Sequence, residues 1–346
     1  MRICCTNPLL DTRWDTFVSQ HPRASAFHQR GWLEALQRTY GYEPLVLTTS
    51  ADGRPLDNGI VLCRVASWMT GNRLVSVPFA DHCQPLLDED RDLTAFDDWL
   101  GRACEQEPLR YVELRPLTAL PRSSLGLERC ASYWFHQLDL SASLDQIFAR
   151  LHKNSFQRNI RRAERERLTY ESGRSRWLVD EFYRLLVTTR RRHHLLPQPR
   201  TWFRNLVDCM GDKIQIRLAR KDGRAIAAML SLRHATSVVF KYGCSDARFH
   251  RFGAVPFLFW KLIAESKAEG ARTIDLGRSD RDQAGLMAFK DRLGATRTLL
   301  NYYRHTNIHA KNAAAAYAAL GTWDTMLALP DMVLSAAGRV LYRHLG

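Results

Sequence analysis

Four catalytic motifs with well-understood mechanisms are absent from this sequence. It contains no G-x-x-x-x-G-K-[ST] phosphate-binding loop, no G-x-S-x-G nucleophile elbow, no H-E-x-x-H zinc helix and no strand followed by G-x-G-x-x-G. These absences remove the usual support for P-loop nucleotide hydrolysis, serine-hydrolase chemistry, zinc proteolysis and dinucleotide-dependent redox chemistry.

Long apolar runs and clustered cysteines are also missing. No window approaches the roughly 18 consecutive apolar residues of a spanning helix, and the N-terminus lacks the apolar core of a signal peptide. The eight cysteines are scattered, with no C-x-x-C pair and no zinc-ligand spacing, which is typical of reduced thiols and predicts no metal site. We therefore expect a cytoplasmic protein, and peripheral contact with the inner membrane stays open as an alternative.

The composition favours a folded protein with phosphate-rich partners. The chain of 346 residues is long enough for two domains, and 45% of its residues are hydrophobic. Lys and Arg number 50 against 36 acidic residues, which gives a net charge of +14. Such a charge attracts nucleic acid, nucleotide cofactors or anionic lipid headgroups, and does not choose among them.

One order of secondary structure is predicted twice along the chain. In the first half, a helix near 27–40 precedes strands at 45–49, 60–68 and 74–79, a helix at 93–104 and a strand at 110–114. In the second half, strands at 214–219, 225–232 and 237–243 precede a helix at 256–268 and a strand at 273–276. The turn Asp52-Gly53-Arg54 matches Asp222-Gly223-Arg224. We infer an internal duplication, with chance similarity of short β patterns as the alternative.

The stretch from Thr273 to Gly294 carries the most unusual lysine. A strand is expected to stop at Gly277, a charged loop follows, and a short helix then brings Leu286, Phe289, Lys290 and Leu293 near one another. Lys290 is thereby placed at the edge of an apolar face. The alternative to a functional role is that the aliphatic part of the Lys290 side chain packs on the core while its ammonium reaches solvent.

The order DLGRSD, Gly285 and FKDRLGA in this stretch resembles the FemAB-like and related acetyltransferase-like proteins of the GNAT superfamily, including those of exosortase-linked exopolysaccharide systems. The resemblance covers most of the chain. It implies an α/β (α+β) fold of tandem GNAT-like domains, each a mixed, mainly antiparallel sheet flanked by helices. We place an N-terminal domain at 1–140, a basic connecting helix at 141–172, a C-terminal domain at 173–307 and a helical tail at 308–346.

The loop from His250 to Pro256 is the expected donor-binding segment. The resemblance implies that the preceding strand and the following helix hold an acyl-CoA, although this loop keeps only one glycine of the usual Q/R-x-x-G-x-G/A pattern. N–H groups at a helix N-terminus can still bind a phosphate. The predicted cofactor-binding residues are Arg248, Arg251 and Gly253, and no tightly bound cofactor is expected.

Arginines recur at helical spacing from Ser143 to Leu168, the longest helical pattern in the chain. Arg158, Arg161 and Arg165 fall on one face, within a K-N-x-x-x-R-x-x-R-R-A stretch that also resembles the FemAB-like pattern. Arginines in register favour a phosphate-rich ligand. A solvated helix face is the plain alternative.

The loop Arg190–Pro199 lies where the resemblance places an acceptor-binding turn. Arg192 and His193 are predicted to bind substrate there, and His193 or His194 could serve as a general base. Polar loop surface is the alternative for the histidine pair. The tail from Ile308 to Leu345 is predicted to be helical and to pack on the core, with contact to an anionic membrane as the alternative.

We therefore predict an N-acyltransferase that moves an acyl or aminoacyl group from acyl-CoA or aminoacyl-tRNA to an amine of a cell-envelope or exopolysaccharide precursor. The donor and envelope setting come from the resemblance. Acyl transfer needs a positive group at the developing oxyanion, for which Lys290 is the candidate. Tyr242 and Asp275 are predicted to position polar groups, and Arg278 and Ser279 to bind an anionic or lipid-linked sugar substrate. The alternative is a non-enzymatic RNA-binding or assembly protein that uses the Arg158–Arg165 face.

Overall fold

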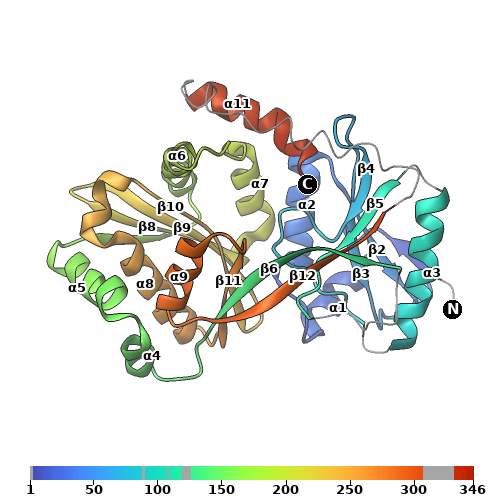
Figure 1. The fold of residues 1–346 in the computed structure, drawn as a ribbon, viewed down its shortest axis with the longest axis horizontal. Coiled ribbons are helices and arrows are strands. Elements are labelled where there is room, and N and C mark those ends of the chain that lie inside the picture. Colours follow the sequence, from blue (N-terminus) through green and yellow to red (C-terminus); the bar gives the residue numbers. More distant parts are fainter. Residues whose placement is uncertain (1–2, 88–89, 107–108, 119–125, 307–330) are drawn as a thin grey trace. The chain divides into compact units, whose positions relative to one another are not determined.

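The computed structural model describes residues 3–87, 90–106, 109–118, 126–306 and 331–346, which cluster into two compact units (Figure 1). Unit 1 comprises Met1–Ser132 with the described parts of Leu300–Thr325 and Ala336–Gly346, and unit 2 comprises Tyr133–Leu299 with the described part of Met326–Ser335. Residues 141–172, which we expected to form a separate connector, belong to unit 2. Across the described ranges, no helix combines the length and apolarity needed to cross a bilayer.

Unit 1 contains a sheet with the strand order β1-β2-β3-β4-β5-β12. Only β4 and β5 run parallel among its pairs, and Tyr303 of β12 lies opposite Leu114 of β5. Its elements are β1 (Cys4–Thr6), α1 (Arg13–Gln20), α2 (Arg30–Tyr40), β2 (Glu43–Thr48), β3 (Ile60–Val65), β4 (Asn72–Val75), α3 (Asp90–Gln106), β5 (Leu109–Leu114) and the C-terminal part of β12 (Thr296–Thr306).

Unit 2 repeats this arrangement with the strand order β7-β8-β9-β10-β11-β6, in which β10 and β11 are parallel. Its elements are β6 (Glu128–Asp139, from Tyr133 onward), α4 (Leu144–Arg150), η2 (Lys153–Gln157), α5 (Arg158–Arg165), β7 (Thr169–Gly173), α6 (Arg176–Arg192), α7 (Arg200–Met210), η3 (Gly211–Lys213), β8 (Ile214–Lys221), β9 (Arg224–His234), β10 (Ser237–Ser245), η4 (Ala247–Phe252), α8 (Ala254–Ala268), β11 (Thr273–Ser279) and α9 (Ala284–Arg292). The remaining described helical segments are η1 (Ala26–His28), α11 (Asp331–Leu341) and η7 (Tyr342–His344).

The repeated order of elements confirms the predicted fold class. In each unit, three antiparallel strands lead through a helix to a strand that runs parallel to the third. In each unit, too, a short strand and two helices come before these three strands. Tandem GNAT-like domains are therefore present, and the detailed superposition of the two halves stays a prediction.

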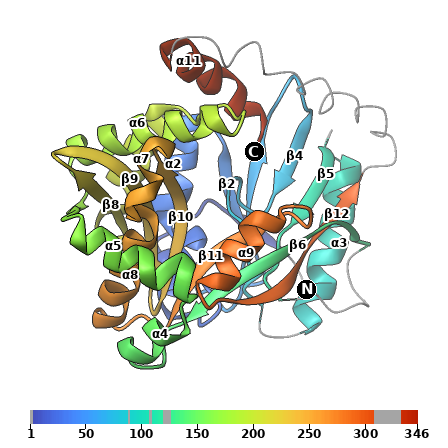
Figure 2. The same cartoon turned by 60° about the vertical axis from the view of Figure 1, so that its left-hand side comes forward.

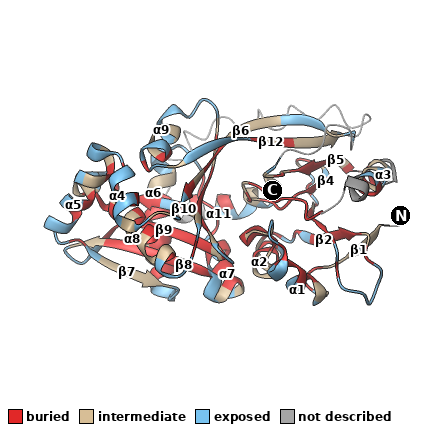
Figure 3. Cartoon of the chain, turned by 90° about the horizontal axis from the view of Figure 1, so that it is seen from below, coloured by how far each residue is buried: buried red, intermediate tan, exposed pale blue. Residues whose placement is uncertain are grey.

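Helices cover both faces of the unit 2 sheet. On one face, α5 lies beside α8, and Ile160, Ala163, Phe259 and Leu262 belong to one buried apolar cluster (Figures 1 and 2). On the other face, α6 and α7 contribute apolar residues such as Phe182 and Phe203. Burial is concentrated in β8, β9 and β10, whereas much of α4 and α5 is exposed (Figure 3).

The predicted continuous helix from Ser143 to Leu168 is interrupted. The chain leaves α4 at Leu151 and His152, both with extended backbone, and then forms η2 and α5. Leu151 is 2% exposed in the core, and His152 Nδ1 accepts a hydrogen bond from the Ser155 N–H at 3.2 Å. Apolar anchoring at one residue and capping at the next explain why the helical pattern breaks there.

Two predicted strand ends are also corrected. The expected strand 74–79 ends at Val75, because Val77 and Phe79 have φ values of +52° and +60°, outside the range of a strand. In contrast, β11 does not stop at Gly277 and continues to Ser279. The register shifts between Asp275 and Arg278, and Gly277, at φ +70°, donates its N–H to Asp275 Oδ1 at 2.6 Å. Gly277 thus permits a bulge, not a stop.

Candidate active site

A cavity of about 360 Å³ opens in unit 2 where β10 ends and α8 begins. Its wall mixes apolar side chains with a few polar groups, which is the usual composition of a small-molecule site. The lining residues are Ile226, Ser245, Asp246, Phe249, His250, Ala254, Val255, Pro256 and Phe289.

The start of α8 gives this cavity an anion-binding end. Gly253 is the N-cap residue, and no side chain caps the helix there. The N–H groups of a first helical turn have no partner within their own helix, and the helix dipole is positive at that end. A phosphate at the mouth of the cavity would satisfy both the charge and the hydrogen-bond donors.

Gly253 is required by its backbone conformation and by close packing. Its φ is +74°, and a Cβ placed on it would lie 2.3 Å from the carbonyl oxygen of Asn159 in α5. We expect Gly253→Ala to cost at least about 1 to 2 kcal/mol for the left-handed backbone, with the clash added to it. Urea denaturation measures this loss. An unchanged free energy of unfolding would mean that α5 moves away freely from the loop.

Three residues from separate elements meet at the mouth of the cavity. Ser245 Oγ lies 2.9 Å from His250 Nε2. Arg192 Nη1 lies 3.4 Å from the same His250 nitrogen. Arg192 Nη1 also donates a hydrogen bond to the Ser245 carbonyl oxygen at 3.3 Å. Burial and the Arg192 charge lower the pKa of His250, and the Asp246 carboxylate offsets part of this decrease. A neutral His250 can therefore accept a hydrogen bond at Nε2 while the arginine supplies positive charge.

The structure thus joins the predicted acceptor loop to the predicted donor loop. Arg192 and His193 end α6, and Arg192 Nη2 lies 3.3 Å from His193 Nε2. Burial, followed by Arg192 and Arg190, lowers the pKa of His193. The exposed His193 imidazole is consequently neutral at pH 7, as a general base must be.

Both predicted cofactor-binding arginines have partners of their own. Arg248 Nη2 forms an ion pair with Asp246 Oδ2 at 2.6 Å, which lowers the pKa of Asp246. Arg251 stacks over the Phe252 ring, 4.8 Å from its centroid, and its carbonyl accepts a hydrogen bond from Arg162 Nη1 at 3.2 Å. Arg248 is therefore partly neutralised at the mouth, whereas Arg251 connects η4 to α5.

Arg158, Arg161 and Arg165 are all exposed on α5, as the helical spacing predicts. Arg161 lies over the Phe148 ring at 5.8 Å. The opposite side of α5 packs in the core through Ile160 and Ala163. The three arginines therefore lie on the solvent side of α5, opposite the side that packs against α8.

Lys290 is far more buried than its sequence pattern predicts. Its side chain is 4% exposed, whereas Leu286, expected on the same packed face, is 41% exposed. Lys290 Nζ donates hydrogen bonds to the carbonyl oxygens of Gly277 and Arg278, each at 2.9 Å. The ammonium is therefore fixed at the bulge of β11, and its neighbour Phe289 lines the cavity.

Tyr242 and Asp275 lie in the interior of the sheet. Tyr242 packs against Phe203, and its hydroxyl accepts a hydrogen bond from Trp202 Nε1 at 3.0 Å, so it faces α7. Asp275 alternates along β11 with Ile274 and Leu276, which belong to the core on the α8 face. Alternation places Asp275 on the same side of the sheet as Tyr242.

The two predicted substrate-binding residues at the end of β11 differ in access. Arg278 is partly exposed, and its guanidinium lies 4.1 Å from the centroid of the Tyr133 ring. Ser279 is 1% exposed, and its hydroxyl has no hydrogen-bond partner within the described part of the chain. Direct contact with a surface ligand therefore suits Arg278 and not Ser279.

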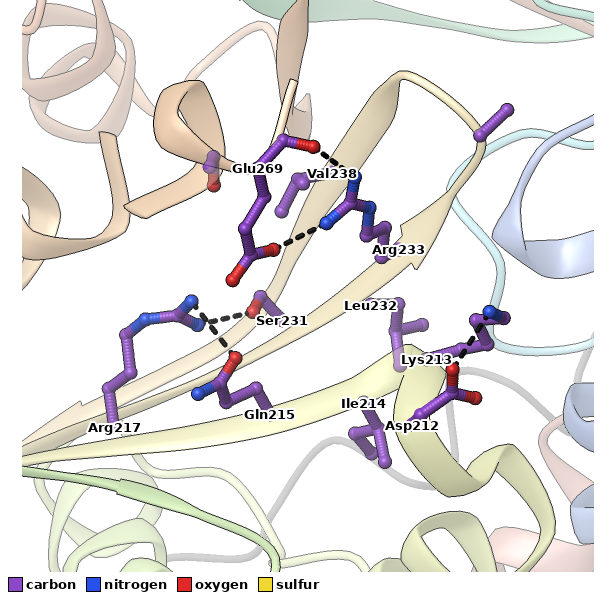
Figure 4. Close-up of a pocket in the computed structure, with 12 residues that line it drawn as sticks. Asp212, Lys213, Ile214, Gln215, Arg217, Ser231, Leu232, Arg233, Val238 and Glu269 are labelled. Carbon is purple, nitrogen blue, oxygen red and sulfur yellow. Dashed lines mark hydrogen bonds and ion pairs between the residues drawn. The ribbon is translucent and has the colours of Figure 1, made fainter. Parts of the chain in front are cut away.

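A second cavity of about 370 Å³ lies at the other end of β8, β9 and β10 (Figure 4). Its arginines have acidic partners: Arg217 Nε donates to Oε2 of Glu265 at 2.9 Å, and Arg233 pairs with Glu269, which also lines the cavity. Arg217 also donates to Ser231 Oγ at 2.6 Å and Gln215 Oε1 at 3.3 Å. These pairs leave the second cavity without the open anion site of the first.

Sequence reasoning did not identify Ser245, Asp246 or Phe289 as site residues, and quoted His250 only as part of a loop. The position of His250 beside Arg192 depends on how α6 packs against β10. The available signal was a polar residue directly after a predicted strand and before a helix, as at Ser245.

Comparison with known families matches residues 150–291 to the acetyltransferase (GNAT) domain. No curated protein matches the sequence. Among solved structures, FemX is similar with a TM-score of 0.69 and 14% identity, over 89% of this chain and 98% of that one.

Two further structures share the fold. The C-terminal domain of a putative lysylphosphatidylglycerol synthetase from Agrobacterium fabrum has a TM-score of 0.56 and 17% identity, over 89% and 94% of the two chains. A tandem GNAT protein from the clavulanic acid biosynthesis pathway has a TM-score of 0.55 and 12% identity, over 88% and 98%. The cavity at the start of α8 lies inside residues 150–291, the part of the chain that matches the acetyltransferase (GNAT) domain.

Proposed function

We propose that unit 2 binds the activated donor of an acyl or aminoacyl group in the cavity at the start of α8 and transfers that group to an amine of a cell-envelope or exopolysaccharide precursor. The observation that carries the proposal is the cavity itself. It combines apolar walls, an uncapped helix N-terminus and the Arg192 guanidinium, within the residues that match the acetyltransferase domain.

The donor is an acyl-CoA or an aminoacyl-tRNA, since both carry phosphates together with a reactive thioester or ester. The GNAT domain favours acyl-CoA, and the exposed arginines of α5 suit the longer phosphate backbone of tRNA. The envelope acceptor is supported by the family resemblance and by one relative whose name specifies lysylphosphatidylglycerol, an aminoacylated lipid.

The reaction requires a base for the proton of the nitrogen and a positive group for the oxyanion. The acceptor nitrogen attacks the acyl carbon, the bond from that carbon to sulfur or to the ribose oxygen breaks, and a new C–N bond forms. The nitrogen loses one proton to a base, and the leaving group takes up one proton. A neutral His193 at the mouth is suited to accept the proton, and the Lys290 ammonium is suited to stabilise the oxyanion charge.

Isothermal titration with coenzyme A tests the donor site. Arg192→Glu is expected to weaken binding by about tenfold or more, because it reverses the charge at the mouth. Arg176→Glu, an exposed position at the other end of the same helix, is the matched control and should leave the affinity unchanged.

Aminoacyl-tRNA and an unrelated RNA, titrated over a salt series, complete the experiment. Preference for coenzyme A or for aminoacyl-tRNA identifies the donor class. Equal, strongly salt-dependent binding of both RNAs with no binding of coenzyme A would instead support the RNA-binding alternative and overturn the acyltransferase proposal.

A further inference from the structure

His136 is a fully buried histidine of β6 that the reaction above does not use. Its side chain is 0% exposed; Nδ1 has no hydrogen-bond partner within the described part of the chain, and Nε2 has only the long contact of 3.5 Å to Asp291 Oδ1. A buried imidazole whose nitrogens are poorly hydrogen-bonded lowers the stability of the fold. The presence of a buried histidine at position 136, where an apolar side chain could pack, therefore needs a physical explanation.

The register of β6 places His136 beside the bulge that binds Lys290. Gln137 lies opposite Asp275 and Phe135 lies opposite Arg278, so the bulge residues Leu276 and Gly277 are across from His136. His136 shares its side of β6 with Leu138, which packs in the core with α8. The His136 ring therefore faces the same side of the sheet as α8. Lys290 of α9 binds the Gly277 carbonyl next to it.

Charged groups around His136 come from two elements. On α9, Asp291 Oδ1 lies 3.5 Å from His136 Nε2, and Lys290 precedes it in the chain. On β12, Arg297 Nη1 lies 3.9 Å from Asp291 Oδ2. On β11, the buried hydroxyl of Ser279, opposite Trp134, contributes a dipole on the same side of the sheet. Burial, then Lys290, lowers the pKa of His136, while Asp291 raises it and Arg297 lowers it.

We propose that His136 is a positioning residue for Lys290, and that the Lys290 ammonium stays at the Gly277 and Arg278 carbonyls only while the His136 imidazole is neutral. A protonated imidazole would place a second buried cation beside the ammonium, and like charges in a poorly solvated site repel strongly. Asp291, whose side chain is 44% exposed, limits but does not cancel this repulsion. The catalytic consequence rests on the proposed function of Lys290, whereas the coupling of the two groups does not.

Nuclear magnetic resonance titration of the histidine ring signals tests the coupling without any substrate. His136→Asn identifies the His136 signal by its disappearance. Lys290→Met is expected to raise the pKa of His136, Lys290→Arg to leave it low, and Asp291→Asn to lower it further. Arg292→Gln, an exposed change on the same helix, is the control. A His136 pKa that ignores Lys290→Met would overturn the proposal. If Lys290→Met fails to fold, Lys290→Gln, which keeps a hydrogen-bond donor but removes the charge, takes its place, and an unchanged pKa there overturns the proposal equally.

The pH dependence of stability supplies an independent readout. Because the folded pKa lies below the ordinary value of 6.5, the unfolded chain takes up the proton first on acidification. The contribution of His136 to stability is therefore complete above about pH 6.5 and falls as the pH drops toward the folded pKa. We expect His136→Asn to lose less stability than the wild type between pH 7.5 and 5.5. Parallel curves for the two proteins would contradict the assignment.

The consequence for catalysis is read from a pH–rate profile with acetyl-CoA and a simple primary amine. The wild type is expected to lose rate by about tenfold for each pH unit below the His136 pKa, whereas His136→Asn keeps a flatter acid limb. If neither protein transfers the acetyl group, the proposed donor is wrong while the coupling measured above still stands. Identical acid limbs in two active proteins would remove His136 from the reaction.

Discussion

Lys290→Met is expected to reduce acyl transfer by about a hundred- to a thousandfold, the effect usually seen when one group that stabilises a developing oxyanion is removed. The structure adds a stability cost that the sequence pattern does not predict. Methionine keeps the apolar stem and leaves the Gly277 and Arg278 carbonyls without the ammonium. We expect the free energy of unfolding to fall by about 2 to 4 kcal/mol, since each buried group left unpaired costs about 1 to 3 kcal/mol.

Two further variants separate catalysis from structure. Lys290→Arg keeps the charge on a wider planar group and should recover only a small part of the rate. Arg292→Met, on the same helix and exposed, controls for loss of a positive charge. Rates are compared under conditions where circular dichroism shows each protein to be folded. Near-native transfer by folded Lys290→Met would make Lys290 a structural lysine, and the catalytic role would pass to another residue.

Reversal of Arg158, Arg161 and Arg165 to Glu together is expected to weaken donor binding strongly and to flatten its salt dependence. All three are exposed on α5, the helix whose Arg162 donates a hydrogen bond to the Arg251 carbonyl in the loop before α8. Each phosphate contact removed lowers the slope of log affinity against log salt by about 0.7 to 0.9. Stability should change little, because exposed charges contribute less than about 1 kcal/mol each.

The matched control reverses three exposed arginines elsewhere in unit 2, Arg174, Arg176 and Arg204, and changes the net charge by the same amount. Titrations of coenzyme A and aminoacyl-tRNA from low to physiological salt compare the two triple variants. An equal loss in both would show that only the overall charge matters. An unchanged affinity and slope in the α5 variant would leave its arginines as a solvated surface.

The order of the repeated strands and helices could be predicted because each of them rests on local pattern, whereas the strands β1, β6 and β7 and the helices α1 and α7 were not predicted. Alternation in the strands, turns such as Asp222-Gly223 and helical spacing near Pro256 all depend on near neighbours in the sequence, and the structure follows them. The exposed arginines of α5 were predictable for the same reason. A helix that packs through Ile160 and Ala163 must expose the opposite face.

The site itself depends on contacts that no local pattern contains. Lys290 is buried because a bulge at Gly277 presents two carbonyls to it, and the bulge is visible only in the pairing of β11 with β6. Arg192 reaches His250 because α6 packs on β10, although the two residues are far apart in the chain. His136 gains its neighbours in the same way, from strands that are adjacent in the sheet and distant in the sequence.

Hydrogen exchange with and without acetyl-CoA tests most directly the claim that the donor occupies the cavity at the start of α8. Bound donor should slow amide exchange in residues 245–257 and 189–193, which include the cavity wall, η4, the first turn of α8 and the end of α6. Residues 212–217 and 231–238, which border the second cavity, should exchange unchanged. Protection confined to the second cavity, or no protection with either acetyl-CoA or aminoacyl-tRNA at saturating concentration, would contradict the account.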